Sequence, residues 1–205
     1  LNNSKFLARC LRSLISQSYE FNKYEIIVIN DGSTDNTNEI LNIFQEDIVI
    51  IDNKKNLGLP TALNKGIKKS KYPYIVRVDS DDYVNFNFLN QLSIFLNMNS
   101  NYDSIACDYL LVKNNGNVIK RCNALKEPIG CGILFKKNHL LKIGLYKKNF
   151  LLHEDRELMK RYLKKYTIGR LELPIYRYRR HKNNITNDKS KDKKYSKMLK
   201  NEISS

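Results

Sequence analysis

The sequence predicts an α/β fold: a mainly parallel sheet with helices on both faces and a small antiparallel extension. Short apolar runs at residues 24–29, 48–51 and 74–78 alternate with helical patterns over the first hundred residues. This alternation is typical of βαβ units, because a parallel strand needs a crossover to return along the sheet. After residue 100 the pattern changes, and two strand-like runs flank Asn-Asn-Gly at residues 114–116, which indicates a hairpin.

The remaining elements follow from apolar residues at helical or strand spacing. Ser4 is a suitable N-cap for the first helix, and Thr34 or Asp35 for the second. The first predicted helix carries the apolar positions from Phe6 to Ile15, and the second carries Ile40, Leu41 and Phe44. Further predicted helices cover residues 59–69, 87–98 and 154–165. The predicted later strands cover residues 105–112, 118–120 and 130–135.

The length of 205 residues fits one domain with its own core. We expect this domain to span residues 1–187 and a basic tail to span 188–205. No stretch approaches the roughly 20 apolar residues that cross a bilayer, and no signal peptide is visible. The four cysteines lack C-x-x-C spacing and are expected to be reduced thiols, so we expect a cytoplasmic protein.

The net charge of +15 is concentrated near the C-terminus. Residues 1–135 carry 15 Lys and Arg against 14 Asp and Glu, whereas residues 136–205 carry 21 against 7. Such asymmetry favours an anionic partner: a phosphorylated substrate, an anionic lipid surface or nucleic acid. A solvated face that aids solubility is the alternative for residues 189–200, which lack a strong apolar face for membrane insertion.

An acidic turn, Asp79-Ser80-Asp81-Asp82, follows the apolar run at residues 74–78. Carboxylates this close repel one another unless a cation or several donors compensate their charge. One interpretation is a site for Mg²⁺ or Mn²⁺, completed by water and substrate phosphates. The alternative is an Asp-rich turn that caps the next helix.

Two further acidic sites lie at the ends of predicted elements. Asp31 follows the strand at residues 24–29, and the pair Glu154-Asp155 begins a predicted helix. Ligands of open α/β sheets bind beyond the carboxyl ends of the strands, so Asp31 and Asp81 together suit a nucleoside diphosphate. Alternatively, Asp31 belongs to an Asx turn, and the acidic pair favours the positive end of the helix dipole.

The order of these motifs resembles bacterial family 2 glycosyltransferases of the GT-A fold. The matching pieces are residues 25–37, residues 56–67, residues 77–82, Glu154-Asp155, and Tyr178-Arg179-Arg180-His181. The resemblance extends to about residue 187. Each motif alone is weak, but several in this order are a strong signal.

The resemblance implies roles for individual residues. Asp31 would contact the nucleotide base with Ser33 nearby, and Asp79 would contact the ribose. Asp81 would bind Mn²⁺ or Mg²⁺ on the pyrophosphate of a nucleotide-sugar donor. Asp155 would be the general base of an inverting sugar transfer to a hydroxyl acceptor.

The resemblance also implies roles for Asn64, Arg77, Arg180 and His181, and structural alternatives exist for some of them. Asn64 and Arg77 would frame the nucleotide site, although Arg77 is equally suited to pairing with the acidic turn. Arg180 would lie beside the donor pyrophosphate, and His181 would contact the metal or the pyrophosphate. For this segment the alternative is an exposed basic strand end.

Two departures from the family pattern stand out. The family begins with a hydrophobic strand in the middle of the sheet and a Pro-x-Tyr-Asn-like turn, whereas this chain starts about where that turn would end, at Asn2-Asn3. Loss of the strand would leave strand edges unpaired, and we favour truncation over an inactive member. Leu63 stands where many relatives carry Arg.

The leading hypothesis is therefore a metal-assisted glycosyltransferase that works in cell-surface polysaccharide or glycan synthesis. Its acceptor would be a glycan or lipid-linked molecule, with peripheral contact to an anionic surface at the inner face of the cell membrane. A nucleotidyltransferase of the same fold class is one alternative. A basic nucleic-acid-binding protein is another, but no binding motif accompanies the charge, so we expect no nucleic-acid partner.

Overall fold

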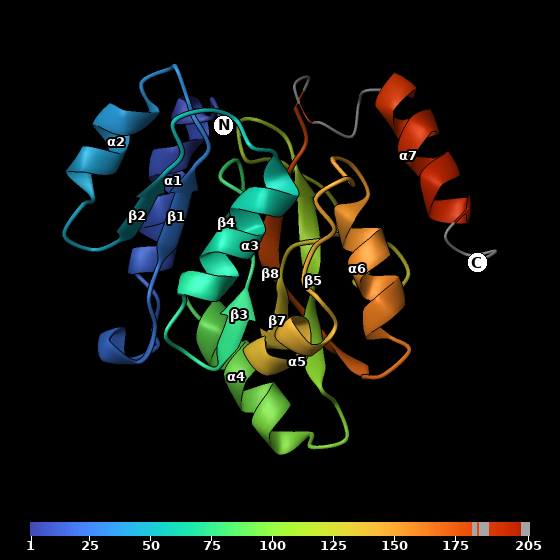
Figure 1. The fold of residues 1–205 in the computed structure, drawn as a ribbon. Coiled ribbons are helices and arrows are strands. Elements are labelled where there is room, and N and C mark those ends of the chain that lie inside the picture. Colours follow the sequence, from blue (N-terminus) through green and yellow to red (C-terminus); the bar gives the residue numbers. More distant parts are fainter. Residues whose placement is uncertain (182–183, 185–188, 202–205) are drawn as a thin grey trace.

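The computed structural model describes residues 1–181, 184 and 189–201, which form two sheets with flanking helices (Figure 1). The helices are α1 (Ser4–Ile15), α2 (Thr37–Ile43), α3 (Leu59–Lys69), α4 (Phe88–Met98), α5 (Lys137–Lys142), α6 (Glu154–Tyr162) and α7 (Lys189–Asn201), with a short 3₁₀ turn at Phe21–Lys23. The strands are β1 (Ile27–Asn30), β2 (Val49–Asp52), β3 (Tyr74–Val76), β4 (Tyr83–Val84), β5 (Ser104–Val112), β6 (Val118–Cys122), β7 (Ile133–Lys136) and β8 (Ile168–Arg179).

The first sheet, here called the small sheet, contains β1 and β2 alone. The two strands are parallel, with Ile27 opposite Val49, and α2 connects them. Helices α1 and α2 pack beside them at one side of the molecule (Figure 1). The buried cluster of this region consists of Leu7, Leu11, Ile26, Leu41, Phe44 and Ile48.

The second sheet has six strands in the order β3-β7-β5-β8-β4, and β6 pairs with β5. The α/β class is confirmed, but the sheets are less parallel than the sequence predicts. Among the described strands, only β1–β2 and β5–β8 pair in parallel, and the other four pairs are antiparallel. The predicted run of parallel neighbours is interrupted because β1 and β3 do not pair with each other.

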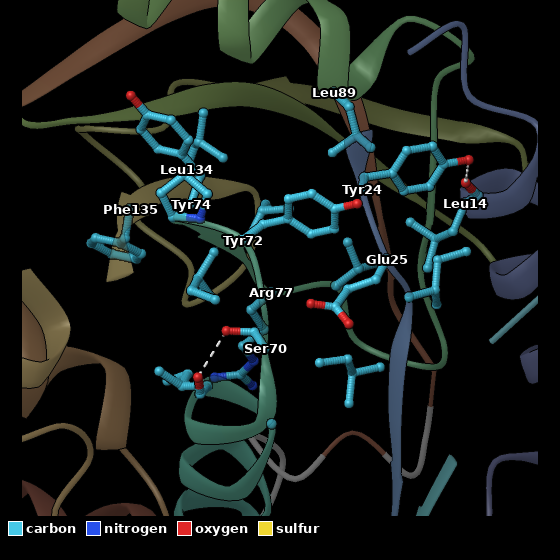
Figure 2. A pocket seen from close by; sticks show the side chains of 18 of the residues that line it. Leu14, Tyr24, Glu25, Ser70, Tyr72, Tyr74, Arg77, Leu89, Leu134 and Phe135 are labelled. Atoms are coloured by element: carbon cyan, nitrogen blue, oxygen red, sulfur yellow. Dashed lines mark hydrogen bonds between the residues drawn. The ribbon is translucent and has the colours of Figure 1, made fainter. Parts of the chain in front are cut away.

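An apolar cavity of about 490 Å³ separates the facing edges of β1 and β3 (Figure 2). It is lined by aliphatic residues of both strands and by Leu14, Leu63 and Leu89 from three helices. Of the described strands, β1 pairs only with β2 and β3 only with β7. These are the unpaired edges expected if the first strand of the family fold is absent, while the truncation itself stays a prediction.

Four elements differ from the sequence predictions, and two of them, the short strand β4 and helix α5, were not predicted at all. Strand β8 was also not predicted, because its polar residues and Pro174 interrupt the apolar pattern expected of a buried strand. The proline lies where the β5–β8 register jumps between Cys107–Leu171 and Tyr109–Tyr176, an irregularity that tolerates a missing N–H. The expected basic tail contains a helix, α7, whose Tyr195 is buried.

Within the described residues, none of the helices is both long and apolar enough to span a membrane. The four cysteines are free and buried.

Candidate functional site

The first residues of the chain join the two acidic loops that follow β1 and β3. The Asn2 backbone N–H donates to Ser33 Oγ at 3.1 Å, and the Asn3 side-chain amide donates to Ser80 Oγ at 2.9 Å. The carboxyl ends of both strands therefore lie at the same edge of the fold, as the sequence predicts.

Asp31 is buried and held by neutral donors from the segment after β2. Its carboxylate accepts from the Asn53 amide at 2.7 Å and from the backbone N–H groups of Leu57 at 3.0 Å and Gly58 at 2.9 Å. Gly32 allows this close approach, because its φ is +75° and a Cβ there would lie within 3 Å of backbone atoms of Lys55. The local sequence thus forms a preorganised loop around a carboxylate.

Arg77 holds the second acidic loop against the start of α6. Its guanidinium donates to both Asp79 oxygens, at 2.7 and 3.0 Å, and to Glu154 Oε1 at 2.9 Å. Burial alone would raise the pKa of Asp79, but the Arg77 charge and the hydrogen bonds from Arg77 and Cys131 together lower that pKa. Burial raises the pKa of Glu154, and Arg77 opposes the rise. Of the two interpretations of Arg77, the geometry favours the pairing with the acidic turn.

Asp155 and Arg77 both pack on Gly130. A Cβ at Gly130 would lie 2.8 Å from Asp155 Cβ and 2.9 Å from Arg77 Nη1, so both side chains closely approach this glycine. The Asp155 carboxylate is partly exposed and accepts from the backbone N–H of Arg156 at 2.8 Å. One carboxylate of the acidic pair is thus held by Arg77, and the other stays accessible.

A third contact links the segment before Asp155 to the loop around Asp31. Leu151, four residues before Asp155, packs on Gly58, where a Cβ would lie 2.8 Å from Leu151 Cδ2. Gly58 also donates to Asp31. The three acidic segments around Asp31, Asp79 and Asp155 therefore form a closed ring of contacts.

Asp81 and His181 meet, although they are 100 residues apart in sequence. Asp81 Oδ2 lies 2.7 Å from His181 Nε2, and the imidazole packs on the Phe6 ring with centroids 5.2 Å apart. A carboxylate oxygen and an imidazole nitrogen are both suitable ligands for Mn²⁺, and the oxygen also suits Mg²⁺. The chemistry of this pair fits the divalent cation that the sequence analysis expects.

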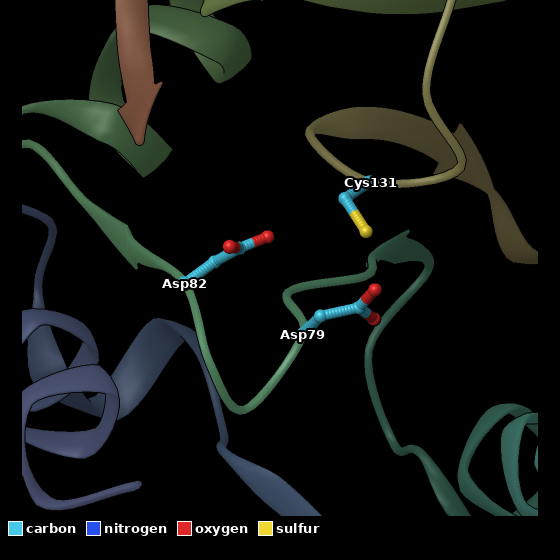
Figure 3. Close-up of side chains that lie close together, drawn as sticks. All are labelled: Asp79, Asp82 and Cys131. Atoms are coloured by element: carbon cyan, nitrogen blue, oxygen red, sulfur yellow. The ribbon is translucent and has the colours of Figure 1, made fainter. Parts of the chain in front are cut away.

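A second group, Asp79, Asp82 and Cys131, also brings potential ligand atoms within 4.8 Å of one another (Figure 3). Its donors fit a hard cation poorly. Asp82 already accepts from the Tyr176 hydroxyl and the Arg179 backbone N–H, both at 2.7 Å.

The pKa shifts in this group agree with a buried hydrogen-bonded network. Burial, together with the charges of Asp79 and Asp81, raises the pKa of Asp82 well above its usual range. Burial likewise raises the pKa of the Cys131 thiol, next to Asp79. A cysteine sulfur suits Mg²⁺ or Mn²⁺ poorly, because these hard cations prefer oxygen ligands.

The other predicted residues are placed as follows. Asn64 is buried on α3, and its amide exchanges hydrogen bonds with the backbone of Tyr146 at 2.8 and 3.0 Å. Ser33 lies beside Asp31 and accepts from Asn2. Arg180 is exposed directly after β8, with its backbone N–H bound to Val112 O. These side-chain hydrogen bonds of Asn64 thus go to Tyr146 and not to an acidic segment, whereas Ser33 belongs to the first acidic loop.

Sequence reasoning missed Arg179 as a central residue. Its side chain is 2% exposed and donates to Asp81 O and Asn114 O, both at 2.7 Å. Its guanidinium also lies over the Phe6 ring. The buried Tyr176, whose hydroxyl donates to Asp82, was missed as well. The tyrosine and arginine alternation of β8 was the available signal, but that strand was not predicted.

The profile described as Glycosyl transferase family 2 matches residues 1–163. The chain belongs to glycosyltransferase family 2. This confirms the resemblance found from the motifs.

Two curated relatives of this family 2 chain are similar to less than half of its length. A poly-beta-1,6-N-acetyl-D-glucosamine synthase of Staphylococcus aureus is 40% identical over 85 residues, which cover 40% of this chain and 20% of the relative. A poly(ribitol-phosphate) beta-glucosyltransferase of Bacillus spizizenii is 39% identical over 108 residues, 46% of this chain and 17% of the relative. The matched part is thus about a fifth of the length of these relatives.

Solved structures confirm the GT-A fold. Staphylococcus aureus TarS 1–349 in complex with UDP-GlcNAc superimposes with a TM-score of 0.76 at 20% identity, covering 90% of this chain and 58% of TarS. The mannosyltransferase PcManGT of Pyrobaculum calidifontis, in complex with GDP-Man and Mn²⁺, superimposes with a TM-score of 0.72 at 15% identity, covering 95% and 59%. At these identities the likeness shows the fold alone.

Proposed function

We propose that this chain transfers a sugar from a nucleotide-diphosphate-sugar donor to a hydroxyl acceptor with inversion at the anomeric carbon. The observation that carries the proposal is the closed ring of contacts among the segments of Asp31, Asp79 and Asp155. The meeting of these three acidic segments supports a single site over three separate turns, in keeping with ligands that bind beyond the carboxyl ends of the strands.

The donor would lie between the two acidic loops. Asp31, with Ser33 beside it, would contact the base, and Asp79 would contact the ribose. The printed names of the structural neighbours include both UDP-GlcNAc and GDP-Man, so the base is left open here. Arg180, exposed next to the site, would approach the pyrophosphate.

Asn64 and Arg77 would support the site from behind. Asn64 fixes α3 to the backbone of Tyr146, and Arg77 fixes Asp79 to Glu154. Positioning of this kind contributes to rate because reacting groups must be held in a narrow range of geometries.

Asp155 would act as the general base. Its carboxylate would take the proton from the acceptor hydroxyl as that oxygen attacks the anomeric carbon. The bond from the anomeric carbon to the diphosphate oxygen breaks as the new glycosidic bond forms on the opposite face. The neighbouring Glu154, tied to Arg77, leaves Asp155 as the accessible carboxylate of the pair.

Asp81 and His181 would hold Mn²⁺ or Mg²⁺. The bound cation would supply Lewis-acid stabilisation of the negative charge that develops on the leaving diphosphate. Their contact across 100 residues supports this assignment over the group of Asp79, Asp82 and Cys131.

The acceptor would be a glycan or a lipid-linked molecule in cell-surface polysaccharide synthesis. The names of the two curated relatives support this class, since one is a polysaccharide synthase and the other acts on poly(ribitol-phosphate). The excess of Lys and Arg over residues 136–205 would, as a whole rather than through any single lysine, favour contact with an anionic surface at the inner, cytoplasmic face of the membrane.

The first test replaces the proposed base. Asp155→Asn should lower turnover by about 10²–10⁴, the usual contribution of a general base, while donor binding stays within about twofold. Asp47→Asn, which changes an exposed carboxylate of the small-sheet region, is the matched control and should keep normal turnover. Near-normal turnover of the Asp155 variant would remove it from this role.

A second test identifies the donor and the metal. A panel of nucleotide sugars is screened for metal-dependent turnover, with and without EDTA, and the released nucleotide is analysed. Loss of activity in EDTA and release of a nucleoside diphosphate would support the proposal. Release of pyrophosphate would indicate the nucleotidyltransferase alternative, and salt-dependent DNA binding without sugar-nucleotide binding would indicate the nucleic-acid alternative.

A further inference from the structure

Helix α7 lies beside α6 and packs on the turn that leads into it (Figure 1). The Tyr195 side chain is buried against Phe150 and Leu152, with the Tyr195 and Phe150 ring centroids 6.4 Å apart. Phe150 and Leu152 belong to the irregular segment at residues 149–153, directly before Glu154. Tyr195 therefore contacts the segment that delivers Asp155.

His153 adds a polar contact between the same elements. Its Nε2 lies 2.9 Å from Asp192 Oδ1 and 3.2 Å from Ser196 Oγ, and the residue is 7% exposed. Its φ of +61° is unusual for a residue other than glycine, and its carbonyl accepts the first hydrogen bond of α6, from Glu157 N. Such a backbone conformation persists only where surrounding contacts hold it.

The residues of α7 divide by face. Asp192, Tyr195, Ser196 and Leu199 are three or four positions apart, so they share one side of the helix. The lysines at positions 193, 194, 197 and 200 are exposed. The helix therefore has a specific inward side, and its basic side stays accessible to solvent.

The segment at residues 149–155, which leads to Asp155, is held from both sides. On the side of the donor site, Arg77 binds Glu154 and Gly58 contacts Leu151. On the other side, the described contacts come from Tyr195 and Asp192 of α7. Fixing the turn between them fixes the start of α6, where Asp155 lies.

We propose that α7 positions the general base, with Tyr195 and His153 as positioning residues rather than catalytic ones. The inference rests on the proposed role of Asp155. It goes beyond that role because it assigns a positioning role to a helix of the basic C-terminal segment, outside the nucleotide-sugar site.

The test compares variants of the inward and outward sides of α7 in the full chain. Tyr195→Ala should lower kcat by about 10-fold to 100-fold, the size of effect expected from misplacing a reacting group, with the donor KM within about twofold. Tyr195→Phe should restore most of kcat because it keeps the apolar contact. Asp192→Ala should lower kcat and Asp192→Asn should retain it, while Lys197→Ala, on the outer side, should be neutral.

Hydrogen exchange gives a readout that does not depend on activity. Amides of residues 150–158 should exchange faster in Tyr195→Ala than in Lys197→Ala, while those of β5 remain unchanged. Equal exchange, or unchanged kcat in both Tyr195→Ala and Asp192→Ala, would overturn the inference. If Asp155→Asn proves active while Tyr195→Ala still loosens this segment and lowers kcat, the base assignment fails and the positioning role stands.

Discussion

The small sheet and the six-stranded sheet each carry an acidic loop, but they hold it with different kinds of interaction. The loop after β1 surrounds Asp31 with an amide and two backbone N–H groups. The loop after β3 relies on the charge of Arg77 between Asp79 and Glu154. The first depends on backbone geometry and glycine, whereas the second depends on charge balance, so the two loops should respond differently to mutation and pH.

The two sheets also differ in how they are joined to the rest of the core. The six-stranded sheet is packed by helices α4, α5 and α6 through two large buried clusters. The small sheet has its own cluster, and the cavity separates it from β3. Helices α1 and α3 provide its main links, because α1 contacts β4 and α3 packs on β1. The small sheet is therefore the less firmly connected of the two.

The largest effect is expected from removing the charge at the centre of the second loop. Arg77→Met should lower the free energy of unfolding by about 4 kcal/mol, because it leaves Glu154 and Asp79 unpaired in a buried site. Urea unfolding measures the change. Arg156→Met, which alters an exposed arginine of the same helix region, is the control.

The double variant Arg77→Met with Glu154→Gln sharpens the comparison. It should recover part of the stability, because it removes one of the stranded charges. A single-variant loss below about 1 kcal/mol would mean that charge pairing does not hold this loop.

The glycine geometry of the first loop gives the next largest effect. Gly32→Ala should cost about 3 kcal/mol, because φ is +75° and the new Cβ would meet the backbone of Lys55 and Asn56 at 2.7–2.9 Å. Gly116→Ala is the matched control, with φ of +90° but a flexible Arg9 side chain as its nearest neighbour. It should cost only about 1 kcal/mol. Equal losses in thermal or urea unfolding would show that close backbone approach is unimportant at Gly32.

A buried ion pair in the six-stranded sheet gives a pH-dependent effect. Burial would raise the pKa of Asp108, but hydrogen bonds from Arg170 and Arg121 outweigh it and lower the pKa to about 2. Its contribution to stability is therefore present above the ordinary Asp pKa of about 3.9 and is lost as the pH falls toward about 2.

The variant Asp108→Asn tests whether the stabilising contribution of Asp108 is lost as the pH falls. At pH 7 the variant should be about 2 kcal/mol less stable than the unaltered chain, the usual size for hydrogen bonds to charged groups. The difference should shrink between about pH 4 and pH 2 in urea unfolding. A difference that does not change with pH would contradict the assignment.

The smallest effect concerns the cavity between the two sheets. A Val-Ile-Val-Ile segment joined ahead of Leu1 should raise the midpoint of thermal unfolding by about 4 °C, if it adds a buried strand between β1 and β3. A Gly-Ser segment of equal length is the control and should leave the midpoint unchanged. Equal midpoints for the two additions would show that the cavity does not accept a strand.

The sequence by itself determined the α/β class, most of the element positions and the acidic segments. Helix α3 begins and ends where its apolar spacing predicts, because apolar periodicity and the residues that end helices are local features. The ordered motifs also predicted the family correctly. The Asp31, Asp81 and Asp155 segments could be found because acidic residues at the ends of predicted strands and helices can be recognised from the sequence alone.

Only the tertiary structure decided which of these residues meet. The contact of Asp81 with His181, the two pairings of Arg77, and the packing of Tyr195 on Phe150 each join distant parts of the chain. Strand β8 brings Arg179 and Tyr176 under the acidic turn, although its own pattern is too polar to predict a buried strand. Such contacts depend on strand order and register, which arise from long-range packing rather than from local sequence.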